Sequence, residues 1–261
     1  MPLLSTRLVV QRRPEPEALM QAVADHLETH LAAALNQQSF KPLGLATGRT
    51  MEPLYRELVR RLSQWPEQRL AQLRGCWSSF NLDEYVGLAS SDPTSFAFYM
   101  QSQLGGPLQL PASQLRLPDG MAADPADEAL RYRADLHRAG GIGLQLLGLG
   151  GNGHVGFNEP PSASDAVCRV VTLQPATRQQ NAGAFGGDPA AVPSRAITLG
   201  LDDILSADEI HLIVTGAAKA EILRRSLLEP CQEAVPASWL QRHPRVHLWV
   251  DDAASAHLPS S

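Results

Sequence analysis

The sequence feature that most constrains the fold is an apolar run at residues 142–149 that leads directly into a glycine-dense loop. Such a run is typical of a strand covered on both faces in a parallel sheet. Four glycines between residues 148 and 153 then permit backbone conformations that side chains would prevent. Asn152, His154 and Glu159 follow, so an amide, an imidazole and a carboxylate stand at a strand's carboxyl end, where open α/β sheets bind ligands.

Three interpretations of this loop compete. Its glycine spacing fits the dinucleotide pattern G-x-G-x-x-G, but that pattern needs a helix directly after it, and residues 154–161 (HVGFNEPP) do not resemble a helix start. A second interpretation makes His154 a hydrogen-bonded core histidine with no chemical duty. The third makes it a general acid/base oriented by its neighbours, and the proximity of Asn152 and Glu159 favours this one.

Length and charge exclude several classes of protein. The 261 residues carry a net charge of -5 with acidic and basic residues interspersed, which gives no footprint for nucleic acid. No apolar run approaches the roughly eighteen residues that span a bilayer, and residues 1–10 lack the features of a secretory signal. We therefore expect one domain over residues 1–261, no nucleic-acid or membrane partner, and a cytoplasmic location.

Cysteine and histidine spacings predict no metal site. Cys76, Cys168 and Cys231 are odd in number and widely separated, so neither a disulfide framework nor a CxxC site is available. His26 and His30 lie four positions apart on a predicted helix, but no HExxH pattern accompanies them. We expect these two histidines to be solvated or to cap a helix.

Strand and helix patterns alternate along the chain, which predicts an α/β three-layer sandwich with a mainly parallel, Rossmann-like sheet. Strands are expected at residues 7–10, 43–46, 76–81, 115–117, 142–149, 168–173, 196–199, 209–214 and 245–250. Helices are expected at residues 15–38, 53–62, 93–104, 124–138 and 175–184 and after residue 215, with a tail from 251. Glycines at 183–187 suit a lid that closes over a ligand, or a mobile surface helix without a duty.

Two strand-to-helix junctions are suited to an anion, because free amides and the helix dipole favour negative charge there. Thr47, Gly48, Arg49 and Thr50 form the first junction, although an ordinary capped helix start explains these residues equally well. The second junction carries Lys219 in the first turn of a helix. A cation is mildly unfavourable at that place, which indicates a compensating anion.

A pair of adjacent carboxylates, Asp83 and Glu84, interrupts an otherwise apolar and aromatic run. In the simpler interpretation Asp83 caps the next turn and Glu84 is solvated. In the functional interpretation at least one of them reaches a site at the strand end.

Four motifs together resemble the glucosamine/galactosamine-6-phosphate isomerase family: FNLDEYVGL at 80–88, GGNGHVGFNEP at 150–160, TGRT at 47–50 and TGAAK at 215–219. The resemblance runs from about residue 43 to 250. Related 6-phosphogluconolactonases share the fold and the glycine–histidine turn but lack matches to FNLDEYVGL and GFNEP. The resemblance therefore implies conversion of glucosamine 6-phosphate and water to fructose 6-phosphate and ammonia, without a metal or organic cofactor.

Site residues follow from the same resemblance. Asp83 corresponds to the base that moves a proton between C2 and C1. His154 corresponds to the group that opens the pyranose ring, with Asn152 and Glu159 beside it as further catalytic residues.

The remaining correspondences concern binding of the sugar phosphate. Arg178 and Lys219 correspond to phosphate ligands together with the turn at 47–50, and Glu84 is expected to bind substrate. Arg49 replaces a Gly or Ser that is frequent in this turn, and an Asn stands at 152 where some members have Asp. Val171 replaces a basic residue that binds an N-acetylated sugar phosphate in regulated hexameric members, which implies hyperbolic kinetics.

Alternatives remain open within this resemblance. In the first alternative the substrate is another hexosamine phosphate, such as galactosamine 6-phosphate. In the second the reaction is a simple ketose/aldose isomerisation. A sugar-phosphate sensor without catalysis is a third possibility, although such domains usually accompany a DNA-binding helix-turn-helix, for which the segment before residue 43 has little room. The number of subunits is left undetermined.

Overall fold

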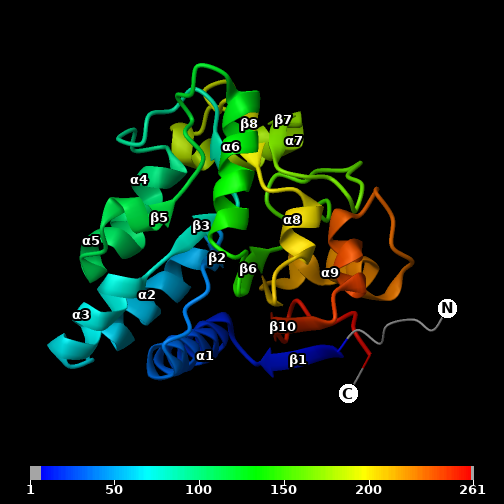
Figure 1. Cartoon of the computed structure of the whole chain (residues 1–261). Helices are drawn as coiled ribbons and strands as arrows, with labels where there is room; N and C mark the ends of the chain where they lie inside the picture. Colours follow the sequence, from blue (N-terminus) through cyan, green and yellow to red (C-terminus); the bar gives the residue numbers. More distant parts are fainter. Residues whose placement is uncertain (1–6, 260–261) are drawn as a thin grey trace.

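A seven-stranded sheet in which all neighbouring strands are parallel forms the centre of the molecule, in a computed structural model that describes residues 7–259 (Figure 1). The strand order is β1-β10-β9-β6-β2-β3-β5. These strands are β1 (Arg7–Arg13), β10 (Arg245–Asp251), β9 (Glu209–Val214), β6 (Leu144–Gly148), β2 (Leu43–Leu45), β3 (Ser79–Asn81) and β5 (Leu115–Arg116).

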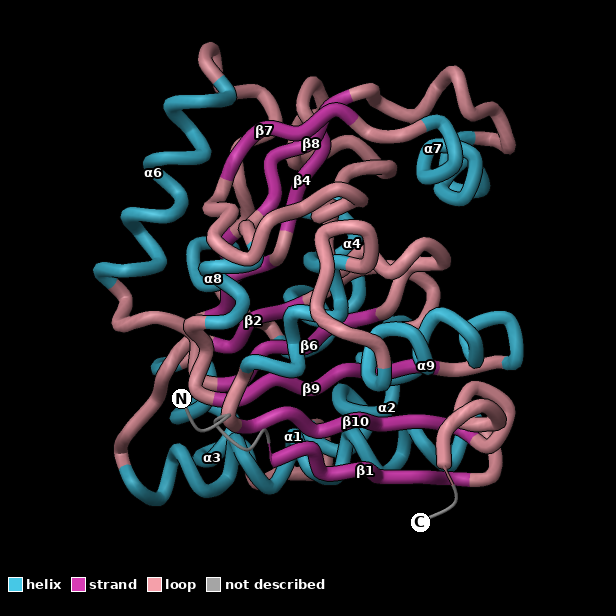
Figure 2. The backbone as a smooth tube through the Cα atoms, turned by 90° about the vertical axis from the view of Figure 1, so that its right-hand side faces the viewer, coloured by secondary structure: helices cyan, strands magenta, loops and turns pink. Residues whose placement is uncertain are grey.

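Helices cover both faces of this sheet (Figure 2). On one face lie α1 (Pro16–Gln37), α2 (Met51–Leu62) and α3 (Glu67–Cys76), and on the other lie α8 (Leu201–Leu205) and α9 (Ala220–Leu228). In α1 the buried residues Leu19, Val23, Leu27 and Leu31 recur every four positions and make the apolar stripe that packs on the sheet. The predicted α/β class with a mainly parallel sheet is confirmed.

A second, three-stranded antiparallel sheet joins β4 (Asp83–Tyr85), β8 (Arg195–Thr198) and β7 (Arg169–Thr172). The strands expected near 168–173 and 196–199 are present, but they belong to this small sheet and not to the parallel one. Leu82 connects the two sheets, because its N–H donates to Leu45 O (3.0 Å) and its carbonyl accepts from Leu199 N (2.7 Å). Asp83 therefore stands where the chain leaves one sheet and enters the other.

Around the small sheet lie α6 (Pro125–Arg138), which packs against β7 and β8, and α7 (Pro175–Asn181), which continues into the 3₁₀ turn η3 (Ala182–Phe185). The predicted helix at 93–104 is α4 (Phe96–Met100), followed by the π-helical η1 (Gln101–Gly105) and the short α5 (Gly106–Leu108). Three further 3₁₀ turns are η2 (Ala112–Gln114), η4 (Ala217–Lys219) and η5 (Pro236–Arg242).

Several expectations were wrong. Helix α3 was not predicted, and the strand expected from Cys76 begins only at Ser79. The expected tail from residue 251 is packed as far as 258: Asp251 is buried and accepts hydrogen bonds from the N–H groups of Gly216 and Ala254. His26 is half-buried, and its ring lies 4.8 Å from the ring of His211, so it is not a solvated histidine.

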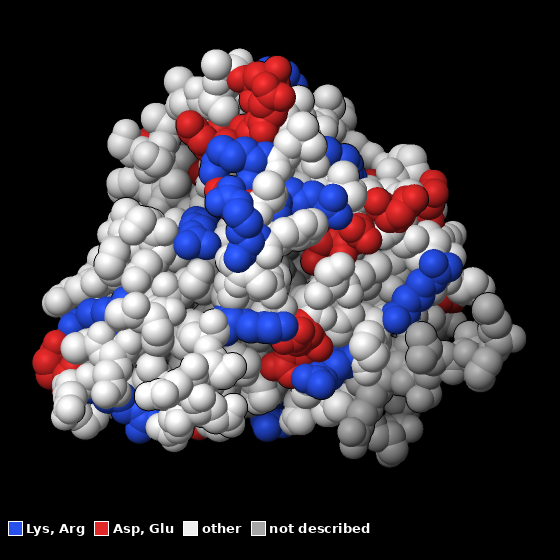
Figure 3. All heavy atoms as spheres, in the orientation of Figure 1, with Lys and Arg blue, Asp and Glu red and all other residues white. Residues whose placement is uncertain are grey.

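Charged side chains intermix on the face that α6 presents (Figure 3). Arg131 pairs with Glu128 and Asp135 on the same helix, and Arg133 pairs with Asp203 of α8. The arginines of these pairs are partly exposed, whereas the carboxylates of Glu128 and Asp203 are buried. Within residues 7–259, no helix is both long and apolar enough to cross a membrane.

Candidate active site

The sheet topology marks one place for a ligand. From β2 the chain proceeds through β3 to β5 on one side, whereas from β6 it proceeds through β9 to β10 on the other. The direction reverses between β2 and β6, and ligands of open α/β sheets bind outside the strand ends at such a switch point. The segments that follow β2, β6 and β9 here are residues 46–50, 149–160 and 215–219.

The loop after β6 folds tightly around the His154 imidazole. Gly153 N donates to Gly150 O (3.1 Å), and Gly150 N donates to His154 O (2.9 Å). A Cβ on Gly150 would lie 2.3 Å from His154 Nε2, so only glycine leaves room for the ring. Gly153 adopts a φ of +86°, which also favours glycine. The glycines thus let the backbone pack closely against the imidazole. No helix follows them directly, so the dinucleotide-binding interpretation does not apply.

Asn152 fixes the tautomer of His154. Its Oδ1 lies 2.6 Å from His154 Nδ1 and also accepts the backbone N–H of His154 at 3.3 Å. Because a backbone N–H can only donate, the amide oxygen faces the ring, and the imidazole proton lies on Nδ1. Burial, with a smaller contribution from Lys219, lowers the pKa of His154 to about 4. The imidazole is therefore neutral at pH 7, with the lone pair of Nε2 available to a substrate.

Asp83 is a buried carboxylate, 5% exposed, with no hydrogen-bond donor among residues 7–259. Burial, and then the charge of Glu84, raise its pKa to about 8. A Cβ on Gly156, whose φ is +56°, would lie 3.3 Å from Asp83 Oδ2. The loop that carries His154 therefore passes directly against the Asp83 carboxylate two residues after the imidazole.

Lys219 provides a cation beside this loop. A Cβ on Gly151 would lie 3.9 Å from its Nζ, and no acidic side chain in the described chain pairs with it. Burial lowers the pKa of Lys219. A half-buried ammonium without a carboxylate partner is suited to a bound anion.

The turn after β2 supplies amides on the other side of the same loop. Gly48 has a φ of +102°, and two buried or half-buried phenols hold the turn: Tyr55 OH donates to Ala46 O (2.5 Å) and Tyr99 OH donates to Gly48 O (3.2 Å). Thr50 is the N-cap residue of α2 without a side-chain capping bond. The side chain of Arg49 is exposed.

Two carboxylates expected in the site bind backbone amides at helix starts. Glu84 accepts from Tyr85 N (2.8 Å), Phe96 N (3.0 Å) and Ala97 N (2.8 Å), so it caps α4 and is buried where solvation was the alternative. Glu159 accepts from Gln174 N (2.8 Å) and from the Thr177 hydroxyl at the start of α7. These hydrogen bonds link Glu159 to α7 and leave the orientation of His154 to Asn152.

The hydrogen bonds of Arg178 go to backbone carbonyls of the segment that follows α7. Its Nε donates to Val192 O (3.0 Å) and one Nη donates to Ala190 O (3.1 Å). The α7 segment that carries it is held by a hydrogen bond from Asn181 Nδ2 to Tyr85 OH (2.9 Å) and by contact between the rings of Phe185 and Tyr85.

Sequence reasoning did not identify Asn158 and Tyr85. Asn158 is fully buried; its Nδ2 donates to Val155 O (3.0 Å) and Leu199 O (2.8 Å), which fixes the turn between His154 and Glu159. Tyr85 anchors an aromatic cluster with Phe96 and Phe157. Both residues lie inside the two longest motifs, so their position was the only available signal.

The site thus combines a carboxylate without a donor, a neutral imidazole with a free Nε2, and an ammonium with a nearby helix start. Together with the switch-point topology, it defines an α/β enzyme that moves protons on a small anionic substrate.

The chain belongs to the glucosamine-6-phosphate isomerases/6-phosphogluconolactonase family, whose model matches residues 14–249. Glucosamine-6-phosphate deaminase of Rhodopirellula baltica is 45% identical over 216 residues, 83% of this chain and 84% of the relative. The enzyme of that name from Oceanobacillus iheyensis is 39% identical over 235 residues, 90% of this chain and 91% of the relative.

Solved structures of a deaminase and of a lactonase are similar to this chain. A monomeric glucosamine-6-phosphate deaminase is similar with a TM-score of 0.82 and 35% identity, covering 95% of this chain and 99% of that chain. The 6-phosphogluconolactonase of Trypanosoma brucei has a TM-score of 0.76 at 20% identity, covering 98% of this chain and 100% of that chain, and shows the shared fold alone.

Proposed function

We propose that this protein converts glucosamine 6-phosphate and water to fructose 6-phosphate and ammonia. The observation that carries the proposal is the contact between the Asp83 carboxylate and the loop of His154, because the reaction needs a base for carbon and a ring-opening group that act on one bound sugar. Support comes from the relatives: those 35% to 45% identical are named for the deaminase, whereas the similar lactonase is only 20% identical.

Binding begins with the phosphate. Lys219 and the amides of the turn after β2 hold the dianion from both sides of the central loop, which fixes the far end of the sugar. Binding energy from this remote group then orients C1 and C2 between His154 and Asp83. Arg178 joins the phosphate when α7 moves toward the bound substrate, through the guanidinium nitrogen that its two carbonyl partners leave free.

Ring opening is assigned to His154. Its Nε2 removes the proton of the C1 hydroxyl and returns a proton to the ring oxygen as the C1–O5 bond breaks, which yields the open-chain aldehyde. A neutral imidazole with Nδ1–H held by Asn152 is in the correct form to begin this step.

Asp83 then performs the carbon chemistry. Its carboxylate takes the C2 proton to form an enolamine and returns a proton to C1, leaving an iminium at C2. Water adds to that carbon and ammonia leaves, which gives the ketose. The protonated amine of the substrate favours the ionised carboxylate against the burial that raises its pKa to about 8.

We assign Glu84 and Glu159 positioning roles, because their hydrogen bonds go to the starts of α4 and α7. The site draws residues from both sheets, so we propose that residues 1–261 act as one domain. We propose a cytoplasmic location, because a charged sugar phosphate formed in the cytoplasm does not cross a bilayer unaided.

Ammonia release from a panel of hexosamine 6-phosphates, with exchange of the C2 hydrogen in deuterated solvent, tests the proposal. We expect release from glucosamine 6-phosphate and a loss of at least about 10²-fold in kcat for Asp83→Asn with little change in KM. Exchange at the parent rate in Asp83→Asn would show that another group is the base. Hydrolysis of 6-phosphogluconolactone without ammonia release from any amino sugar would refute the deaminase assignment.

A further inference from the structure

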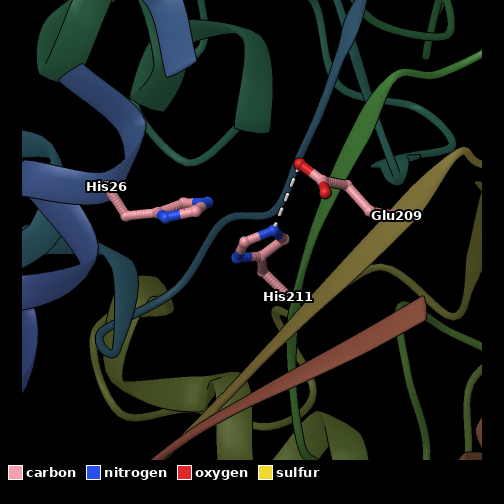
Figure 4. A group of neighbouring side chains, drawn as sticks. All are labelled: His26, Glu209 and His211. Atoms are coloured by element: carbon pink, nitrogen blue, oxygen red, sulfur yellow. Dashed lines mark ion pairs between the residues drawn. The ribbon is translucent and has the colours of Figure 1, made fainter. Parts of the chain in front are cut away.

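A histidine cluster lies beneath α1, at the opposite end of β9 from Lys219. Glu209 is the first residue of β9, His211 follows two positions later, and His26 approaches from α1 (Figure 4). A strand of this length extends roughly 20 Å, so the cluster is remote from the proposed chemistry. Nothing in the proposed reaction uses it.

Two buried nitrogens in this cluster have no hydrogen-bond partner: His26 Nε2 and His211 Nε2. Buried polar atoms in folded proteins are nearly always paired, so this arrangement calls for a partner between them. One ligand atom from each of His26, Glu209 and His211 lies within 4.8 Å of the other two. Figure 4 shows the His26 and Glu209 side chains directed toward the same space as the His211 ring.

The Glu209–His211 separation is near that of two ligands on one metal ion, whereas the widest separation in the set, up to 4.8 Å, has to shorten on binding. Glu209 Oε1 lies 3.5 Å from His211 Nε2 and 3.6 Å from His30 Nδ1, and its Oε2 lies 3.9 Å from His247 Nε2. These separations are too long for good hydrogen bonds. Two ligand atoms on a tetrahedral zinc ion, each about 2.0–2.1 Å from the metal, stand about 3.3 Å apart.

The three side chains are also of the types that a transition metal binds. Two imidazoles and one carboxylate, each offering one ligand atom, form a set that suits a divalent ion of this kind.

We propose that His26, Glu209 and His211 bind a divalent transition-metal ion of the Zn²⁺ type that fastens α1 to β9. Three protein ligands leave a fourth position, which water or His30 fills. The site is structural, since it joins helix α1 to strand β9 and lies away from the catalytic loops.

Binding changes the tautomer of His211. Trp249 Nε1 donates to His211 Nδ1 (2.9 Å), so the neutral ring carries its proton on Nε2 when no metal is present. Coordination through Nε2 moves that proton to Nδ1 and breaks the hydrogen bond from the indole. Two buried N–H groups would then face each other without an acceptor, which costs more than one lost hydrogen bond, so the Trp249 indole has to move away from His211 on binding. This movement makes the fluorescence of Trp249 a reporter of binding.

Titration of the chelator-treated full chain with Zn²⁺, and separately with Mg²⁺, tests the proposal. We expect one Zn²⁺ per chain, a rise in Tm and a change in tryptophan fluorescence, with no such response to Mg²⁺. His26→Gln and Glu209→Gln should each weaken Zn²⁺ binding at least about tenfold. The matched control is His137→Gln, at an exposed histidine on α6, which should bind as the parent does.

Zn²⁺ binding that is unchanged by both ligand substitutions, or the absence of stoichiometric binding to the parent, would overturn the proposal in favour of a metal-free network of hydrogen bonds. If the variants fail to fold, Co²⁺ bound to the parent must show the visible absorption of tetrahedral coordination, and a lack of it has the same meaning. Ammonia release from the chelator-treated parent should persist. A negative result for metal binding would therefore leave the proposed function untouched, and the reverse also holds.

Discussion

Burial of Asp83 favours its protonated form, whereas the proposed reaction needs the ionised carboxylate. A carboxyl whose folded pKa is raised to about 8 from 3.8 keeps its proton in the folded state over a range in which the unfolded chain has lost it. The folded state then binds more protons, so stability is complete below the unfolded pKa and is lost as pH rises toward about 8. An enzyme that needs this carboxylate ionised therefore accepts a less stable fold at its working pH.

Asp83→Asn should separate the two effects. The amide keeps the shape but carries no charge, so we expect the variant to unfold at a higher temperature than the parent at pH 8, with the difference shrinking toward pH 5. Thermal unfolding at several pH values measures this. Asp165→Asn, at an exposed carboxylate, should show no such pH-dependent gain. A constant difference between Asp83→Asn and the parent at all pH values would contradict the raised pKa.

His154 should be required for one step only. We expect His154→Gln to slow a pyranose substrate by at least about 10²-fold, because the free Nε2 is lost. A 5-deoxy analogue lacks the hydroxyl that closes the pyranose ring, and it should react in the variant nearly as it does in the parent. Steady-state rates with both compounds make the comparison. An equal loss on both would show that His154 acts beyond ring opening.

The sequence motifs predict which residues lie in the site, because they place these residues at strand ends. The roles of Glu84 and Glu159 could not be predicted in this way. A motif contains the same residue type whether its carboxylate faces a substrate or caps a helix. Only the positions of α4 and α7 show that both carboxylates accept backbone N–H groups.

Among the elements, the loop after β6 depends on the small sheet for its position. Gly156 has a φ of +56°, and a Cβ there would lie 3.2 Å from Thr198 Oγ1 and 3.3 Å from Asp83 Oδ2. A left-handed conformation costs a non-glycine residue about 1–2 kcal/mol, and the contact displaces the carboxylate as well.

We therefore expect Gly156→Ala to destabilise the protein by about that amount and to lower kcat. Gly183→Ala, where a Cβ meets open space and φ is not positive, is the matched control and should leave both unchanged. Denaturant unfolding and initial rates measure the two quantities. Normal kcat in Gly156→Ala would mean that Asp83 tolerates displacement.

The helix that begins near Lys219 should contribute to substrate binding and little to the chemical step. Lys219→Ala removes a charge-assisted contact of about 1.5–3 kcal/mol to a phosphate that is present in both ground and transition states. We expect KM to rise by about 10- to 100-fold with kcat nearly unchanged. A fall in kcat at constant KM would place Lys219 at the reacting carbons.

At the scale of the whole molecule, the parallel sheet was predictable and the small sheet was not. Each long strand of the parallel sheet shows its buried, apolar pattern locally, as residues 144–148 do. β4 has only three residues, DEY, and becomes a strand by pairing Asp83 with Thr198, far along the chain. The buried residues after 250 likewise depend on Asp251 meeting Gly216, a contact that no local pattern contains.

Regulation by a second sugar phosphate is a property of the whole molecule, and the residue at position 171 allows a prediction about it. The resemblance placed a basic residue at 171 in regulated relatives, and here Val171 of β7 packs beside the cluster around Tyr85 and Phe157. An apolar side chain in that position offers no charge to a phosphate. We expect a hyperbolic dependence of rate on substrate concentration and no activation by N-acetylglucosamine 6-phosphate, whatever the number of subunits. Substrate curves measured with and without that compound are the test, and a sigmoidal curve that it relieves would require an effector site built from other residues.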